Sequence, residues 1–186
     1  MERLDVYYKI VGKADEINDF YSKLQKLDRG RDTYIEFYKT IKATGIKFEY
    51  FGEAMNWIYQ YTLNTDGSLS LCCVTSSWGD EHVWRYLLKG MYPSFSIYFA
   101  ELWFMEPFVS TNDVNKKVFP GKWMLFDADG EPKCFPSITS ACKYVKHLTG
   151  EDVSPDFEKI SDAVWEYDKK CDNYSLEFVE ILRDRQ

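Results

Sequence analysis

The chain has 186 residues, of which 45% are hydrophobic and 28% charged, a composition typical of folded globular proteins rather than disordered ones. No apolar run approaches the roughly 20 residues that span a bilayer, and the first residues lack a signal-peptide core. Thirty acidic and 23 basic residues give a net charge of -7, which disfavours unaided binding to duplex nucleic acid. We therefore expect a soluble, cytoplasmic protein that binds neither membranes nor duplexes directly.

The excess negative charge is concentrated at the end of the chain. Residues 151–186 hold 11 acidic and 5 basic residues, whereas residues 1–150 hold 19 and 18. A field of one sign steers a protein toward a partner of the opposite charge. This asymmetry predicts that residues 151–186 meet a basic surface of a partner.

The cysteines indicate neither disulfides nor a metal site. Their odd number and the absence of a signal sequence favour reduced thiols. No C-x-x-C motif is present, and His82 and His147 do not have the spacing of zinc ligands. Residues 127–131 have the Asp and Gly of a turn but lack the distant glutamate of a calcium loop, so we predict no metal and no cofactor. The five cysteines are Cys72, Cys73, Cys134, Cys142 and Cys171.

The first quarter of the chain has the pattern of a strand followed by helices. Alternating apolar residues predict a strand over 4–11, and apolar residues at helical spacing predict a helix over 14–27. A capping-box pattern predicts a short helix over 33–45, with a strand over 34–41 as the alternative. Residues 46–55 favour neither structure.

The next segment has the pattern of a hairpin, a helix and a long strand. An Asp-Gly pair between two alternating runs, 56–64 and 68–76, is a strong hairpin signal. Apolar residues at helical spacing predict a helix over 80–90, and the aromatic run 94–105 predicts a strand.

Without the segment 30–55, the order of these elements is strand, helix, strand, strand, helix, strand. This is the βαββαβ order of ferredoxin-like folds, whose two helices cover one face of an antiparallel sheet. We therefore predict an α+β fold with a ferredoxin-like core over 1–107 and an insertion at 30–55. Residues 108–186 are predicted to form a strand-plus-helices extension that packs on the core in one compact unit.

The extension contains one predicted strand, 122–127, followed by three predicted helices. Gly150 ends the first helix, and a Ser-Pro pair begins the second. Apolar residues that recur every three positions predict the third. The three helices are expected over 138–150, 155–168 and 175–184.

A row of acidic residues is the most suggestive feature of this extension. Glu158, Asp162 and Glu166 recur at intervals of four, so they line one side of a helix, opposite its apolar stripe. Like charges at this spacing cost a few tenths of a kcal/mol per pair, so folding alone does not favour them. Two interpretations remain open, a solvated face and a docking face for a basic partner.

The sequence supports neither base stacking nor a known catalytic motif. The strand predicted over 68–76 carries no aromatic or basic residue, unlike RNA-recognition motifs, so Trp57 and Tyr59 on its neighbour are interpreted as core or interface residues. No serine-hydrolase, metalloprotease or phosphate-loop motif is present. His82, which follows two acidic residues, is either a general base or an exposed residue in a first helical turn.

Five residues between 66 and 101 stand at places comparable with a known family. They are Thr75, Trp78, Tyr92, Pro93 and Glu101. In this respect residues 4–126 resemble the YubB ferredoxin-like family, in which a hairpin strand, a helix and a long aromatic strand follow one another. Such proteins are typically carried by phages and plasmids and have no established enzymatic role. The resemblance implies a ferredoxin-like fold and a role in counter-defence.

These observations predict a non-catalytic protein-binding module of a mobile genetic element. We expect an inhibitor, similar to anti-CRISPR proteins, that engages a basic surface of a host immune effector such as a nucleic-acid-guided one. The residues predicted to bind the partner are Glu158, Asp162, Glu166, Trp57, Tyr59 and Trp78. One alternative is a nucleic-acid-binding accessory protein of a phage or plasmid that uses Arg29, Arg31, Lys116 and Lys117, and another is a hydrolase that uses His82.

Overall fold

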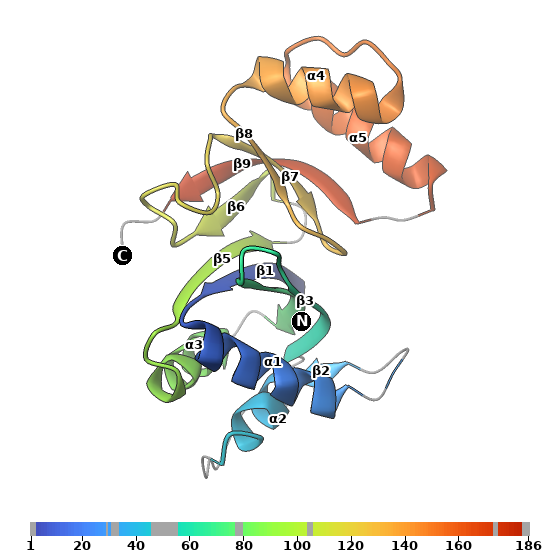
Figure 1. Ribbon diagram of the computed structural model, residues 1–186. Coiled ribbons are helices and arrows are strands. Elements are labelled where there is room, and N and C mark those ends of the chain that lie inside the picture. The colour runs from blue at the N-terminus through green and yellow to red at the C-terminus, as the bar shows by residue number, and fades with distance from the viewer. Residues whose placement is uncertain are drawn as a thin grey trace. The chain divides into compact units, whose positions relative to one another are not determined.

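The chain forms two compact units, Met1–Phe99 (unit 1) and Ala100–Gln186 (unit 2), whose elements are drawn in Figure 1. The computed structural model describes residues 3–28, 30, 34–45, 56–76, 80–103, 106–172 and 175–183. Within these ranges, no helix has both the length and the apolar character needed to cross a membrane.

Unit 1 is a sheet with helices on one side (Figure 1). Its strands are β1 (Arg3–Val11), β2 (Ile35–Glu36), β3 (Asn56–Leu63), β4 (Leu69–Ser76) and β5 (Ser96–Trp103), and its helices are α1 (Ala14–Leu27), α2 (Phe37–Lys42) and α3 (Asp80–Met91). The strand order is β2-β3-β4-β1-β5, and β4 pairs antiparallel with both β1 and β3. β5 continues from unit 1 into unit 2.

Aromatic side chains join β1 to the helices of unit 1. The ring of Trp84 in α3 lies 4.5 Å from that of Phe37 and 5.2 Å from that of Tyr8, and all three are buried. The indole Nε1 of Trp84 donates a hydrogen bond to Thr40 Oγ1 at 2.9 Å, which satisfies its polar group inside the core.

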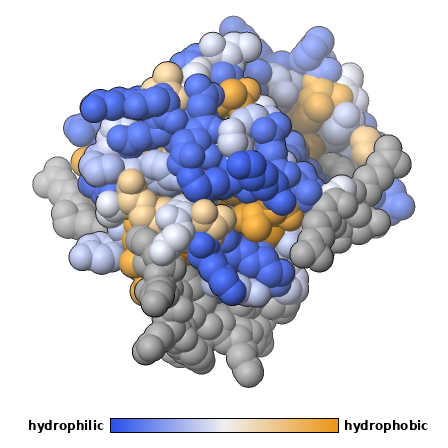
Figure 2. All heavy atoms as spheres, turned by 60° about the horizontal axis from the view of Figure 1, so that its bottom comes forward, coloured by the Kyte–Doolittle hydropathy of each residue, from blue (hydrophilic) through white to orange (hydrophobic). Residues whose placement is uncertain are grey.

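The surface is largely hydrophilic in the view of Figure 2, where small hydrophobic groups lie among polar residues. Tyr86 of α3 is 78% exposed, and Val83 of the same helix is also exposed. Single exposed apolar side chains are normal in soluble proteins and do not by themselves indicate a binding site.

The hairpin predicted around the Asp-Gly pair is confirmed. β3 and β4 pair antiparallel, and Gly67 in the turn has a φ of 79°, which glycine adopts without steric cost. The register shifts between Ile58 and Gln60, so Tyr59 lies at a bulge in β3.

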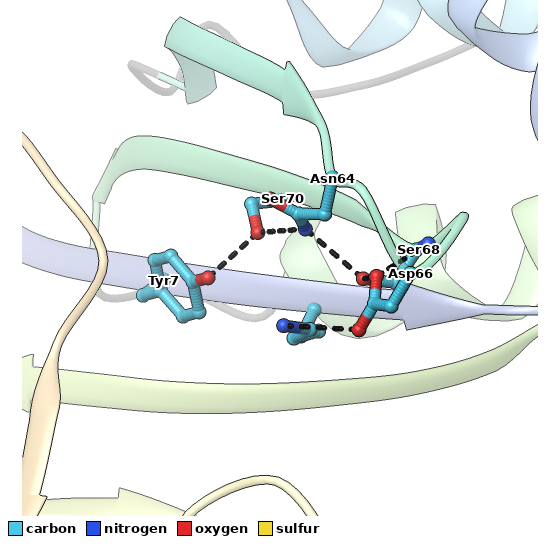
Figure 3. Close-up of polar contacts among 6 residues, drawn as sticks. Tyr7, Asn64, Asp66, Ser68 and Ser70 are labelled. Carbon is cyan, nitrogen blue, oxygen red and sulfur yellow. Dashed lines mark hydrogen bonds and ion pairs between the residues drawn. The ribbon is translucent and has the colours of Figure 1, made fainter.

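A chain of hydrogen bonds ties this hairpin to β1 (Figure 3). Ser70 Oγ lies 2.7 Å from the Tyr7 hydroxyl and accepts a hydrogen bond from Asn64 Nδ2 at 2.8 Å. Asn64 Nδ2 also donates to Ser68 Oγ at 3.0 Å, and Ser68 Oγ donates to Asp66 Oδ1 at 2.5 Å. Because these polar groups bond to one another, we assign the network to the stability of the hairpin rather than to ligand binding.

Acid is expected to weaken this hairpin. Hydrogen bonds from the Ser68 side chain and backbone lower the pKa of Asp66, and the charge of Lys9 lowers it further. A carboxylate whose pKa is lowered by folding stabilises the folded state above its ordinary pKa, and this stabilisation is lost as the pH falls through the lowered value. We therefore expect wild type to have a larger free energy of unfolding than Asp66→Asn at neutral pH, as measured by urea denaturation. The two free energies are expected to converge as the pH falls below 3.8. A difference that persists in acid would contradict this assignment.

Unit 2 is a set of strands covered by two helices (Figure 1). Its strands after β5 are β6 (Phe108–Thr111), β7 (Trp123–Asp127), β8 (Lys133–Phe135) and β9 (Leu176–Arg183), and its helices are α4 (Ile138–Thr149) and α5 (Phe157–Lys170). β9 pairs parallel with β6 and antiparallel with β7. The helices pack on this sheet through a buried cluster of Leu125, Phe135, Ala141, Val145, Ile160, Val164 and Phe178.

The two helices of unit 2 have identifiable ends. Ser137 caps α4 in a capping box with Ser140, and Gly150 has a φ of 79° at its other end, as predicted. The side chain of Asp156 accepts a hydrogen bond from the Lys159 backbone at the start of α5. The residue that caps α5 is therefore two positions after Ser154, the serine of the Ser-Pro pair predicted to begin this helix.

A buried carboxylate organises the loop between β6 and β7. Asp113 is 1% exposed and accepts backbone hydrogen bonds from Lys117, Val118 and Phe119 at 2.9, 2.7 and 2.8 Å. The Phe119 carbonyl in turn accepts from Arg183 Nη2 at 2.5 Å, which ties the loop to β9. Charge-assisted hydrogen bonds from the Asp113 carboxylate and the Arg183 guanidinium group thus hold the loop.

The predicted fold class, an α+β ferredoxin-like βαββαβ antiparallel sheet with a helical C-terminal extension, is wrong. The described strands form a nine-stranded sheet in the order β2-β3-β4-β1-β5-β6-β9-β7-β8. This sheet is mixed because β6 and β9 are parallel. The extension supplies four of the strands, and the segment predicted as the helix 175–184 forms β9.

The error at β9 has a physical cause. Its neighbouring residues Phe178 and Val179 are 2% and 1% exposed, so both faces of the strand are buried. Such a strand lacks the alternation of apolar and polar residues that distinguishes a strand from a helix.

The segment 33–45 contains β2 followed by α2, whereas 46–55 lies outside the described residues. The packing of the extension on the core as one compact unit stays a prediction.

Candidate partner-binding site

The acid row, Glu158, Asp162 and Glu166, lies on the outside of α5. All three residues are exposed, whereas Ile160 and Val164 of the same helix face the core. None of the three carboxylates has a hydrogen-bond or ion-pair partner among the residues described. Their charges are therefore available to a partner, although their role in binding stays a prediction.

A groove of about 410 Å³ lies beside the acid row. α5 contributes Phe157, Asp162 and Trp165 to its lining, and the segment before β6 and the strand β9 contribute Glu106 and Glu177. We call this feature the α5 groove. It combines aromatic surface with three carboxylates, so it suits a ligand that is apolar in one part and cationic in another.

Trp165 is the most exposed aromatic side chain of the α5 groove. It lies three residues after Asp162 and therefore on the same side of the helix. The side chain is 52% exposed, which leaves a large apolar surface at the rim. Tryptophan is strongly enriched among the residues that dominate binding energy at protein interfaces.

The floor of the α5 groove is held by packed rings. Phe157 lies with its ring centroid 5.6 Å from that of Phe178 on β9 and 5.6 Å from that of Trp123 on β7. Trp123 and Phe178 stack on each other at 5.8 Å. Because these rings fix one another, the groove is formed before a partner arrives, which reduces the cost of binding.

Two of the three aromatic residues predicted to bind the partner belong to unit 1. Trp57 on β3 stacks on Tyr34 with 5.3 Å between ring centroids, and Tyr59 is half-buried at the bulge. Both belong to unit 1, whereas the acid row belongs to unit 2. Trp78 lies outside the described residues. A common site of these aromatic residues and the acid row therefore stays a prediction.

The structure describes the cysteines and also His82, the residue considered as a general base. The thiol of Cys73 is buried, and burial raises the pKa of Cys134 to about 12, so both thiols stay protonated at neutral pH. His82 Nδ1 lies 2.6 Å from Arg85 Nη2, and it accepts this hydrogen bond because arginine only donates. In the part of the chain that the structure describes, no three residues of the His, Cys, Asp or Glu type are placed to hold a metal ion.

The basic residues of the nucleic-acid-binding alternative are only partly described. Lys116 and Lys117 are exposed in the loop between β6 and β7, and Arg29 and Arg31 lie outside the described residues. A basic patch made of these four residues therefore stays a prediction.

Sequence reasoning placed the acid row correctly on one side of a helix but missed Trp165 as its aromatic neighbour. The interval of three residues from Asp162 could have shown that both side chains share a flank of α5. The rest of the groove comes from β9 and from the segment before β6, which no local pattern connects to α5.

No protein-family model matches the chain, and neither the curated proteins nor the solved structures gave a match.

Proposed function

We propose that the chain is a non-catalytic protein-binding module whose acid row and α5 groove bind a basic segment of a partner protein. This proposal rests on one juxtaposition, in which exposed carboxylates of α5 adjoin a half-exposed tryptophan and an aromatic groove. Carboxylates steer and orient a basic partner, whereas a buried aromatic anchor supplies most of the affinity.

The charge of the groove favours a basic protein over a nucleic acid. Asp162, Glu106 and Glu177 would all repel phosphate groups. A lysine or arginine side chain can instead lay its methylene groups on the aromatic rim while its cationic end meets a carboxylate. The expected partner therefore presents basic residues next to an apolar one.

The resemblance to the YubB family extends the proposal to a biological setting. In that setting the module belongs to a mobile genetic element and acts in the host cytoplasm as a counter-defence inhibitor, similar to anti-CRISPR proteins. Its target is the basic channel of a nucleic-acid-guided immune effector, because such channels gather lysine and arginine to bind phosphates. The support for this extension is the resemblance together with the acidic end of the chain.

A designed peptide pair tests the proposed chemistry. A labelled helical peptide of lysine and leucine is compared with a counterpart in which glutamate replaces every lysine. We expect the full chain to bind only the lysine peptide, as measured by fluorescence anisotropy. The affinity is expected to fall about ten-fold or more as the salt concentration rises from about 50 to 500 mM, because salt screens exposed charges. Equal binding of both peptides, or binding that salt does not change, would exclude this mechanism.

A further inference from the structure

A second cavity of unit 2, of about 250 Å³, lies near the end of α5. Its walls come from β7 and the turn after it, β8, α4, α5 and the start of β9. Polar and aromatic side chains predominate among the residues that line it. They include Asp127, Glu131, Lys133, Tyr144, Tyr167 and Asp168.

Asp168 has a carboxylate oxygen without a hydrogen-bond donor. The residue is 1% exposed, and its Oδ2 accepts the backbone N–H of Leu176 at 2.9 Å. Its Oδ1 is also buried, but it has no hydrogen-bond partner among the described residues. A buried carboxylate oxygen is costly unless a donor or a cation meets it. Asp168 is one of the residues that line the cavity, so we look for the missing donor there.

Asp127 adds a second negative charge to the same cavity. Its Oδ1 accepts the backbone N–H of Asp129 at 2.9 Å, which fixes the carboxylate at the end of β7. Burial raises the pKa of Asp127, and the negative charges of Asp129 and Asp168 raise it further. A cation bound between Asp127 and Asp168 would relieve this repulsion.

One aromatic ring that lines the cavity is in contact with the ammonium group of a lysine of the chain itself. Lys133 Nζ lies 4.2 Å from the centroid of the Tyr144 ring, which is the geometry of a cation–π contact. Tyr167 supplies a second aromatic side chain to the lining. The cavity thus combines the two features, carboxylates and aromatic faces, that proteins use to bind organic ammonium ions.

We propose that this cavity binds an alkylammonium group, with Asp168 Oδ1 as the acceptor and Tyr144 and Tyr167 as aromatic walls. A guanidinium group fits less well because it prefers two free oxygens of one carboxylate, and Asp168 has only one. A compact ammonium has three donors that can point to separate oxygens. The site does not depend on the proposed function of the α5 groove, since the two cavities present different acidic residues.

NMR titration of the full ¹⁵N-labelled chain tests this site. The probes are n-butylamine, an Nα-acetyl-lysine methylamide and, as a neutral match, n-butanol. We expect both amines to shift the amide signal of Leu176, whose N–H bonds to Asp168, and butanol to leave it unchanged. A response to the lysine derivative alone also supports the site and assigns the ammonium group to a protein side chain.

Matched variants identify the acceptor. Asp168→Asn can keep the contact to the Leu176 N–H through its amide oxygen while it places a donor where the ammonium would bind, so affinity is expected to fall about ten-fold or more. Asp127→Asn is a second variant at the same cavity and is expected to weaken binding. Asp15→Asn is the control, because it removes one exposed carboxylate that does not line the cavity. Lys133→Met is expected to tighten binding, because it removes a like charge from the wall.

Three results would overturn the proposal. The first is an equal response to butanol and n-butylamine, which would make the cavity merely apolar. The second is unchanged amine affinity in both Asp168→Asn and Asp127→Asn. The third is displacement of the amine by an equal concentration of Ca²⁺, which would identify a metal site.

Discussion

Reversing the acid row in the variant Glu158→Lys, Asp162→Lys, Glu166→Lys is expected to weaken binding of the lysine peptide by about 100-fold or more. Each reversal replaces an attraction by a repulsion. Three changes of about 1 kcal/mol each add to about 3 kcal/mol, which corresponds to this loss of affinity. All three residues are exposed, so the fold should remain intact. The measurement is fluorescence anisotropy at about 50 mM salt, with circular dichroism to check folding.

A charge-matched variant separates the acid row from the net charge of the chain. Asp15→Lys, Asp129→Lys, Glu151→Lys changes three exposed acidic residues that lie outside α5. The net charge changes by the same amount in both triple variants. We expect this control to weaken binding by less than about three-fold, because none of the three residues lines the α5 groove and exposed charges are screened by salt. If the two triple variants lost the same affinity for the lysine peptide, binding would depend only on the net charge of the chain. The acid row would then not be a binding site.

Replacing Asp113 by alanine is expected to destabilise unit 2 by about 3 to 5 kcal/mol. The substitution removes a buried carboxylate that accepts three backbone hydrogen bonds and leaves those N–H groups without their acceptor. Urea denaturation of the full chain measures the loss. Hydrogen exchange at the Val118 and Phe119 amides reports the effect locally, and both amides are expected to lose protection.

Two further variants complete the Asp113 test. Asp113→Asn keeps one acceptor oxygen and should fall between wild type and alanine, which preserves a readout if the alanine variant does not fold. Val114→Ala changes an exposed side chain of the same loop, and we expect it to alter stability by less than about 0.5 kcal/mol. If Asp113→Ala were no less stable than Val114→Ala, the carboxylate would not organise the loop.

Elements with local signals could be predicted from the sequence. The hairpin was predictable because Gly67 adopts the positive φ that its turn requires, and the Asp-Gly pair marks that turn. The helix α4 was predictable because Ser137 and Gly150 mark both of its ends. In each case a few neighbouring residues carry the information.

Elements defined by distant partners could not be predicted in this way. β6 and β9 pair in parallel although Val109 and its partner Ile181 are separated by most of unit 2. The prediction of a helix for β9 is wrong because the consecutive buried residues of this strand hide the alternation of apolar and polar positions. The mixed sheet, and with it the correct fold class, follows from this long-range pairing.

The candidate site likewise combines a feature that local sequence spacing predicts with features that depend on long-range packing. The acid row was predictable because intervals of four place carboxylates on one side of a helix. The groove beside it was not, because Trp165 on α5 meets β9 residues only after the sheet has formed. The buried Asp168 was also beyond sequence reasoning, since its lack of a donor depends on packing around the end of α5.

The most direct measurement of the central claim is the map of amide signals that shift when the lysine peptide binds to the ¹⁵N-labelled chain. If the acid row and the α5 groove receive the basic partner, the largest shifts will fall on α5 between Glu158 and Glu166 and on β9 between Leu176 and Val179. Shifts confined to unit 1, or small shifts spread over both units, would contradict that claim.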